Sequence, residues 1–122
     1  MTPGELQKLS GPTLEAFYAT LEAPERLPVG TFTGEAWLAT WPSITRLIGA
    51  LWQGKTFTGD AVTNRILWAQ RVQGRVWIEG SDLIIDYPKL KLRDYLRPVT
   101  PWLYFGHMKI GRAMVYFTLV EA

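Results

Sequence analysis

The chain has 122 residues, which fits one domain, and a domain of this size buries roughly two-thirds of the surface that its unfolded chain exposes. It has no cysteine, which excludes disulfide bonds, thiolate zinc sites, cysteine-bound iron–sulfur clusters and a cysteine nucleophile. The net charge of +2 is small and the basic residues are scattered, so we expect no nucleic-acid partner.

The N-terminal residues and the apolar runs bear on the location of the protein. Met1 to Glu5 lack the basic and apolar regions of a secretory signal. No apolar run approaches the ~20 residues that a membrane span requires. We therefore expect a cytoplasmic protein without a membrane span. The six Trp, five Tyr and five Phe fit a β-rich core, a pocket lining or a dimer face.

The first part of the chain predicts a helix, because apolar residues recur there at three- and four-residue spacing: Leu14, Phe17, Tyr18 and Leu21. Ser10 or Thr13 suits the cap of this helix, and Pro12 suits its first turn. The segment 23–28 contains two prolines and predicts an extended passage that leads to Gly30.

The next part predicts a strand and then a short helix. In the strand, Gly30-Thr31-Phe32-Thr33-Gly34, the glycines permit a bulge or a close backbone approach. A helix is predicted from Pro42 to Leu51, where apolar residues share one face, and Gly54 is well placed to end it.

The rest of the chain is rich in β-branched and aromatic residues and predicts strands. The predicted strands are Val62 to Val72, Arg75 to Glu79, Leu83 to Tyr87, Trp102 to Lys109, and Arg112 to Val120. Turn signals separate them at Gln73-Gly74, Gly80-Ser81 and Ile110-Gly111. Connections this short predict an antiparallel meander.

The last two strands are apolar on both faces. A turn at Ile110-Gly111 places Lys109 opposite Arg112, His107 opposite Met114, and Phe105 opposite Tyr116. One face then carries Trp102, Tyr104, Met108, Ala113, Val115, Phe117 and Leu119, and the other carries Leu103, Phe105, His107, Met114, Tyr116 and Thr118. Such a sheet predicts a barrel, with one face inside and the other against helices or a second subunit. We therefore also expect a homodimer.

Several short blocks, taken in order, resemble a known family. Gly30-Thr31-Phe32-Thr33-Gly34 resembles the signature of the GXWXG protein family, with Phe32 in place of the central tryptophan. The segment from Leu51 to Phe57 resembles the second block of that family. Downstream segments resemble the domain of unknown function that usually follows it: Leu83 to Tyr87, Leu92 to Val99, Gly106 to Met108, and Tyr116 to Leu119.

The resemblance implies a compact lipocalin-like β-barrel and no established activity. Thr40-Trp41-Pro42-Ser43 stands where the family has a Gly-His pair, so any role of that pair is not carried over. The predicted fold is α+β and mainly β, a single lipocalin-like domain over residues 1–122. It has an antiparallel barrel, an N-terminal helix and one short helix after the first strand.

Three polar residues are candidates for ligand contact. Lys55 either binds an anionic head group or lies at a solvated strand end. His107 is the only histidine, which excludes a multi-histidine metal site, and it is either a core residue or a polar group that orients a ligand. Arg97 follows Asp94 by three residues in a predicted turn or irregular segment, so it either pairs with Asp94 or binds a ligand carboxylate.

These observations predict non-catalytic binding of a small hydrophobic or amphipathic molecule in the barrel cavity, with no cofactor and no metal. The predicted apolar contacts are Trp52, Phe57, Phe105, Met114 and Tyr116, and the predicted polar contacts are Lys55, Arg97 and His107. One alternative is an enzyme acting on a lipid-like or cyclic molecule, with His107 or Asp94 as general acid or base. Another is a solid barrel that serves structure or oligomerisation.

Overall fold

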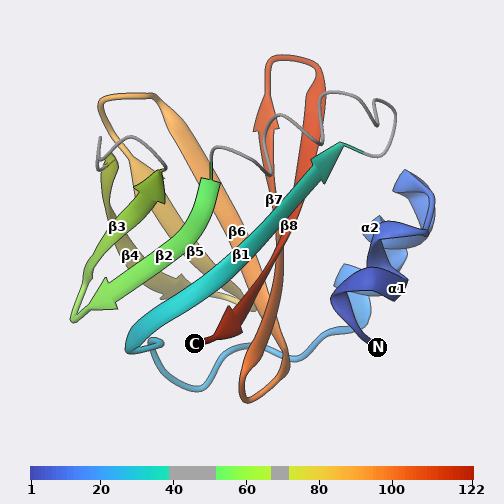
Figure 1. Ribbon diagram of the computed structural model, residues 1–122, viewed down its shortest axis with the longest axis horizontal. Helices are drawn as coiled ribbons and strands as arrows, with labels where there is room; N and C mark the ends of the chain where they lie inside the picture. The colour runs from blue at the N-terminus through green and yellow to red at the C-terminus, as the bar shows by residue number, and fades with distance from the viewer. Residues whose placement is uncertain (39–51, 67–71) are drawn as a thin grey trace.

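The computed structural model describes residues 1–38, 52–66 and 72–122. Eight strands form a closed antiparallel barrel in which β8 pairs with β1 (Figure 1). They are β1 (Gly30–Leu38), β2 (Trp52–Thr58), β3 (Ala61–Ile66), β4 (Val72–Glu79), β5 (Asp82–Tyr87), β6 (Leu92–Thr100), β7 (Leu103–Ile110) and β8 (Ala113–Glu121). The predicted α+β, mainly β, antiparallel barrel is confirmed. The predicted helix from Pro42 to Leu51 lies outside the described residues.

Two short helices precede the barrel, α1 (Pro3–Gln7) and α2 (Gly11–Thr20). The prediction of α2 is confirmed, and the Ser10 hydroxyl caps it by accepting a hydrogen bond from the backbone N–H of Thr13 at 3.3 Å. Helix α1 was not predicted. Its signal is a capping box, in which Thr2 and Glu5 each accept the other's backbone N–H at 3.2 Å.

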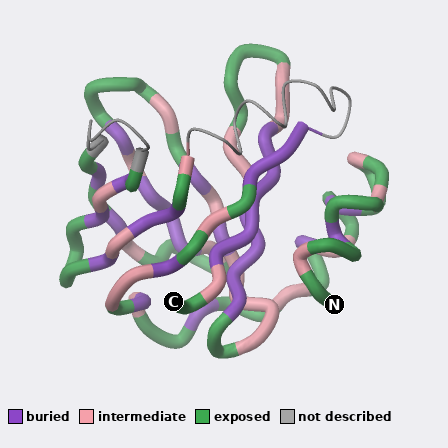
Figure 2. The backbone as a smooth tube through the Cα atoms, viewed as in Figure 1, coloured by how far each residue is buried: buried purple, intermediate pink, exposed green. Residues whose placement is uncertain are grey.

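The helices cover the outer face of the barrel beside β1, β7 and β8 (Figure 1). Besides the core inside the barrel, a second hydrophobic core lies between the helices and the barrel wall. It joins Leu6, Leu14 and Tyr18 of the helices to Trp37, Phe105 and Tyr116 of the strands. As a result, β8 is buried on both faces over Val115 to Leu119 (Figure 2). Helices of the same chain thus cover the apolar outer face that was one reason to expect a homodimer.

The predicted register of the last hairpin is wrong by two residues. His107 lies opposite Tyr116 and Ile110 lies opposite Ala113, because the turn falls at Gly111-Arg112, where Gly111 has a φ of 58°. The shift is an even number of residues, so the side chains within β7 and β8 keep their predicted faces. Trp102 does not, because β7 begins at Leu103 and Trp102 lies exposed in the turn before it. One predicted face therefore lines the barrel interior, and the other lies outside.

Two further predictions about strands are wrong. Gln73-Gly74 lies within β4 and not in a turn, and the Cβ of any other residue at Gly74 would lie 2.7 Å from the Tyr87 ring. The region around Asp94 is the regular strand β6 and not an irregular segment. The pairing of β6 changes register between Pro98 and Thr100, and such an irregularity accommodates a proline within a strand.

The two glycine-containing blocks of the sequence form the neighbouring strands β1 and β2. Phe32 lies opposite Lys55, and Thr33 lies opposite Gly54. Gly54 has a φ of 138°, and a Cβ there would lie 2.0 Å from the Phe32 carbonyl oxygen. A Cβ at Gly34 would lie 2.4 Å from the Trp52 ring. The glycines therefore let β2 approach β1 closely and let the Trp52 ring lie against the strand.

The two ends of the barrel differ. We call one end the strap end, after the segment 21–29 that leads to β1. Near this end, Phe32 packs edge-on against Phe57 and Tyr104, with ring centroids 5.6 and 5.8 Å apart. Leu27 of the segment 21–29 packs against the core inside the barrel, to which Phe32 belongs. The opposite end, the pocket end, carries the β5–β6 and β7–β8 turns. No helix in the described part of the chain has the length and apolar character needed to cross a bilayer.

Candidate functional site

A pocket of about 240 Å³ lies inside the barrel at the pocket end. Its lining is mostly apolar, from Ala36, Trp52, Leu90, Met108, Ile110, Val115 and Phe117, with four polar residues, Lys55, Asn64, Tyr87 and Asp94. Small-molecule sites are typically apolar cavities of ~300 to 1,000 Å³ with a few convergent polar groups. The pocket therefore has the chemistry of such a site, and its volume lies just below the usual range, which suits only a compact ligand.

Its four polar residues form one hydrogen-bonded group, the inner cluster of Lys55, Asn64, Tyr87 and Asp94. The Lys55 ammonium lies 2.8 Å from Asp94 Oδ2 and donates to Asn64 Oδ1 at 2.6 Å and to the Tyr87 hydroxyl. The Tyr87 hydroxyl in turn donates to Asp94 Oδ2 at 2.9 Å. The four residues come from four strands, β2, β3, β5 and β6, and alternation along each strand directs them inward.

Burial dominates the electrostatics of the inner cluster. The side chains of Lys55 and Asp94 are only 3% and 1% exposed. Burial lowers the pKa of the Lys55 ammonium, and the charge of Asp94 opposes that shift. Burial, followed by the charge of Asp94, raises the pKa of the Tyr87 phenol, which is therefore a neutral hydrogen-bond donor at neutral pH. Removing either charge would leave the other buried and unpaired.

Trp52 connects the inner cluster to the apolar part of the pocket. Its indole N–H donates to Asn64 Oδ1 at 3.0 Å, so this oxygen accepts from both Trp52 and Lys55. The Lys55 ammonium lies over the rings of Trp52, Tyr87 and Phe117, at 5.2, 5.0 and 5.6 Å from their centroids. Aromatic faces thus supply part of the solvation that Lys55 loses on burial.

One oxygen of the inner cluster, Asp94 Oδ1, is buried and has no hydrogen-bond partner among the described residues. Trp37 Nε1 and Thr118 Oγ1 share this property, but they belong to the outer face of the barrel. Asp94, by contrast, lines the pocket. A buried acceptor without a donor costs free energy. A ligand that brings an N–H or O–H group to this oxygen recovers that cost.

The barrel wall divides the eight residues predicted to contact a ligand, so they do not form one site. Trp52 and Lys55 line the pocket. Phe57 is also inside the barrel but packs in the closed half near the strap end. The remaining apolar residues, Phe105, Met114 and Tyr116, lie on the outer face beneath the helices.

The other two predicted polar contacts also lie on the outer face. His107 packs against the rings of Tyr18 and Tyr95, with centroids 4.7 and 5.6 Å apart, and burial lowers its pKa. Arg97 donates through Nε to Asp82 Oδ1 at 2.9 Å, and Tyr18 donates to the same oxygen at 2.5 Å. We name Tyr18, Asp82 and Arg97 the outer cluster.

The predicted local ion pair between Asp94 and Arg97 is wrong. Residues three apart on a strand point to opposite faces, so Asp94 meets Lys55 inside the barrel and Arg97 meets Asp82 outside. The sequence reasoning also missed Asn64 and Tyr87. The sequence does contain a signal for Tyr87. This residue continues the every-second-residue pattern of Leu83 and Ile85, whose side chains belong to the core inside the barrel.

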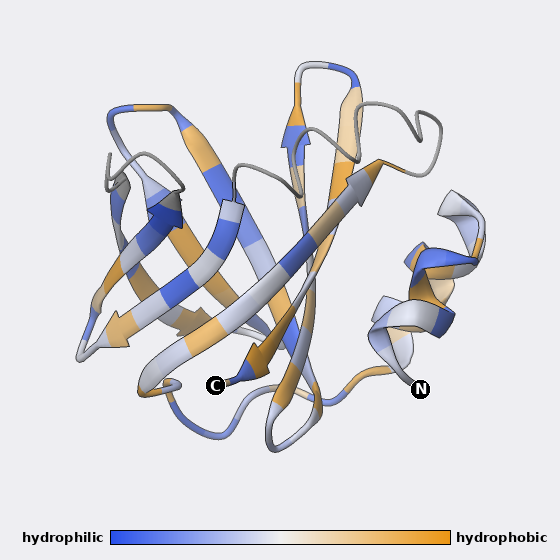
Figure 3. Ribbon diagram, in the orientation of Figure 1, coloured by the Kyte–Doolittle hydropathy of each residue, from blue (hydrophilic) through white to orange (hydrophobic). Residues whose placement is uncertain are grey.

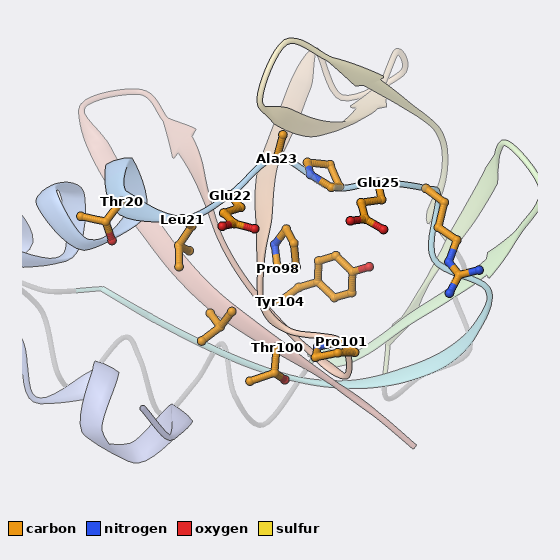
Figure 4. A pocket seen from close by; sticks show the side chains of 12 residues that line it. Thr20, Leu21, Glu22, Ala23, Glu25, Pro98, Thr100, Pro101 and Tyr104 are labelled. Atoms are coloured by element: carbon orange, nitrogen blue, oxygen red, sulfur yellow. The ribbon is translucent and has the colours of Figure 1, made fainter.

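A second cavity, of about 470 Å³, lies at the strap end between the segment 20–26 and the β6–β7 hairpin (Figure 4). Its rim carries Glu22, Glu25 and Arg26. None of the buried unpaired polar atoms of the described residues belongs to its lining, so we regard the barrel pocket as the candidate site. Residues 1–38, 52–66 and 72–122 contain no group of three or more side chains suited to hold a metal ion.

Comparison with known proteins supports the fold. No protein-family model matches the chain, and no curated protein matches it. The crystal structure of a protein from Thermomonospora curvata is similar, with a TM-score of 0.70 and 20% sequence identity. The match covers 98% of this chain and 92% of that one. At this identity the likeness shows that the barrel and its helices are a shared fold.

Proposed function

We propose that the protein binds a small hydrophobic or amphipathic molecule in the barrel pocket, without catalysis. The observation that carries the proposal is the unpaired Asp94 Oδ1 of a residue that lines a mostly apolar pocket. A solid structural barrel needs neither a cavity nor a buried acceptor without a donor. A cytoplasmic location, a homodimer and membership of the GXWXG family stay predictions.

The inner cluster favours one kind of ligand. The Lys55 ammonium already has three partners, Asn64, Tyr87 and Asp94, and so it offers no free donor to an anionic head group. The free position is an acceptor. We therefore propose a ligand with an apolar body, which packs against residues such as Trp52 and Phe117, and a hydroxyl or amide N–H, which donates to Asp94 Oδ1.

Native mass spectrometry of the freshly purified protein tests this proposal, together with organic extraction of any retained molecule. A matched pair of variants locates the binding. Val115→Phe fills the pocket, whereas Val29→Phe makes the same change at a residue that is 74% exposed. We expect a retained molecule in the wild type and in Val29→Phe and its loss in Val115→Phe.

Two results would contradict the proposal. One is a protein that carries no molecule and also fails to bind a neutral hydrophobic fluorophore. The other is a molecule that Val115→Phe retains as well as the wild type does, which would place binding outside the pocket. Circular dichroism of both variants checks that the barrel is intact.

A further inference from the structure

The mouth of the pocket carries two similar turns. The β5–β6 turn presents Leu90 between Lys89 and Lys91, and Figure 3 shows the hydrophobic band between hydrophilic ones there. The β7–β8 turn presents Ile110 between Lys109 and the Gly111-Arg112 pair. Leu90 and Ile110 are 50% and 48% exposed, and both also line the pocket. Two aliphatic side chains thus project at the mouth, each flanked by exposed basic residues.

The charges of the described residues are unevenly divided between the two ends of the barrel. Positions 88–91 and 109–112 contain four basic residues and no acidic one. The nearby Asp86 pairs with Arg93 at 3.0 Å. The strap end carries mostly acidic residues instead: Glu79, Glu121, Glu22 and Glu25, with Arg26 among them. The two described turns therefore present basic residues beside the pocket mouth, in a chain with a net charge of only +2.

We propose that the pocket end docks onto the surface of an anionic phospholipid bilayer. Leu90 and Ile110 enter the boundary between head groups and acyl chains, and the flanking lysines and arginine meet the lipid phosphates. Exposed aliphatic side chains beside basic ones suit this interface, where hydrocarbon lies directly beneath negative charge. An acidic protein partner would need an apolar pocket for each tip in addition to its negative charge, whereas a bilayer supplies hydrocarbon beneath negative charge at both tips.

Docking in this orientation gives the pocket a route to apolar molecules. The mouth faces the bilayer, so a lipid-soluble ligand moves between bilayer and pocket with little exposure of its apolar body to water. The acidic strap end faces away from the lipid, which fixes the orientation because anionic lipid repels it. Docking itself does not require a ligand in the pocket.

Co-sedimentation of the full chain with phospholipid vesicles tests the proposal. We expect binding to phosphatidylcholine vesicles that contain phosphatidylserine, little binding to pure phosphatidylcholine, and release at high salt. Removing one basic residue at such a surface lowers partitioning about fivefold, so Lys89→Glu with Lys109→Glu lowers it by at least ~25-fold. Leu90→Ser with Ile110→Ser weakens binding at every salt concentration.

The matched control is Lys8→Glu with Arg26→Glu, which changes the net charge equally but away from the pocket mouth. We expect it to keep most of the vesicle binding. We also expect Val115→Phe to bind vesicles normally, which separates this inference from ligand binding. Thermal unfolding confirms that each variant is folded.

Three results would overturn the inference. They are the absence of vesicle binding by the folded wild type, equal binding to neutral and anionic vesicles, and equal losses in the control and the mouth variants. The fraction that pellets without vesicles measures self-association and is subtracted in each case.

Discussion

The inner and the outer cluster contain the same three kinds of group, a cation, an aspartate and a tyrosine, on opposite sides of the barrel wall. In the outer cluster, Arg97 and Asp82 are 17% and 27% exposed, and Arg97 Nη1 also donates to the carbonyls of Tyr18 and Leu21 at 3.3 and 3.4 Å. Arg97 therefore holds the C-terminal end of α2 against the barrel. The inner cluster is closed to solvent and leaves Asp94 Oδ1 without a partner beside a pocket.

The comparison shows that environment, and not composition, distinguishes a structural cluster from a candidate binding site. In the outer cluster, water screens the charges, and Arg97 uses its remaining donors on backbone carbonyls. In the inner cluster, the same kind of ion pair costs more to bury, and one oxygen of Asp94, a residue that lines the pocket, has no partner among the described residues. Breaking each cluster in turn should therefore give different losses of stability.

The largest loss is expected for Lys55→Met, which leaves the Asp94 carboxylate buried without its cation. Breaking one partner of a buried ion pair costs about 3 to 5 kcal/mol of unfolding free energy. Lys55→Met combined with Asp94→Leu removes both charges and should recover most of that loss. Urea unfolding measures both variants. If Lys55→Met alone lost less than about 1 kcal/mol, as expected for a surface ion pair, the assignment of a buried ion pair would be contradicted.

A smaller loss is expected for Gly34→Ala. The new Cβ lies 2.4 Å from the Trp52 ring, so the ring must move and weaken its hydrogen bond to Asn64. Overpacking of this kind costs about 1 to 3 kcal/mol. Gly4→Ala is the control, since its Cβ meets nothing closer than 4.0 Å. Equal unfolding free energies for the two variants would show that Trp52 does not occupy this position.

For the outer cluster, we expect Arg97→Met to cost about 1 to 2 kcal/mol, because the lost hydrogen bonds involve a charged group that is partly exposed. The loss should be local. Hydrogen exchange should accelerate in α2 and remain unchanged in β2 and β3, which carry part of the inner cluster. Uniform acceleration across the barrel would contradict the role of this cluster as a helix clamp.

The smallest effect on the unfolding free energy is expected from the titration of His107. Burial lowers the pKa of His107, so below its ordinary value near 6.5 the unfolded chain binds more protons than the folded one. Stability therefore falls as pH drops from 6.5 toward the folded pKa. His107→Phe keeps an aromatic ring against Tyr18 and removes the titration. The unfolding free energy of this variant should depend less on pH in that window than that of the wild type; identical slopes would exclude His107 as the cause.

The sequence was sufficient to predict the barrel, helix α2 and the faces of β7 and β8, because all three rest on local periodicity. It was not sufficient to predict the site, which depends on the pairing of strands distant in the sequence. Lys55 was a candidate, but its partner Asp94 lies 39 positions further along, on a strand that Pro98 obscured. Proline removes a backbone donor and so weakens the signal of a strand.

The mixing of two faces in the predicted site has the same origin. Both faces of β7 and β8 carry residues that could contact a ligand. The alternation of the sequence alone does not say which face is interior. Helices α1 and α2 decide this, because Leu6 and Leu14 cover Phe105 and Tyr116. That contact joins the ends of the chain, and no local pattern encodes it.

Calorimetric titration of the purified protein with naphthol and with methoxynaphthalene tests the central claim most directly. The two ligands share an apolar body, but only naphthol brings a hydroxyl donor to Asp94 Oδ1. We predict one naphthol per chain, bound about tenfold more tightly than methoxynaphthalene, as a hydrogen bond of roughly 1.4 kcal/mol gives. The preference should vanish in Lys55→Met with Asp94→Leu. Equal affinities in the wild type, or the same preference in that double variant, would contradict the account.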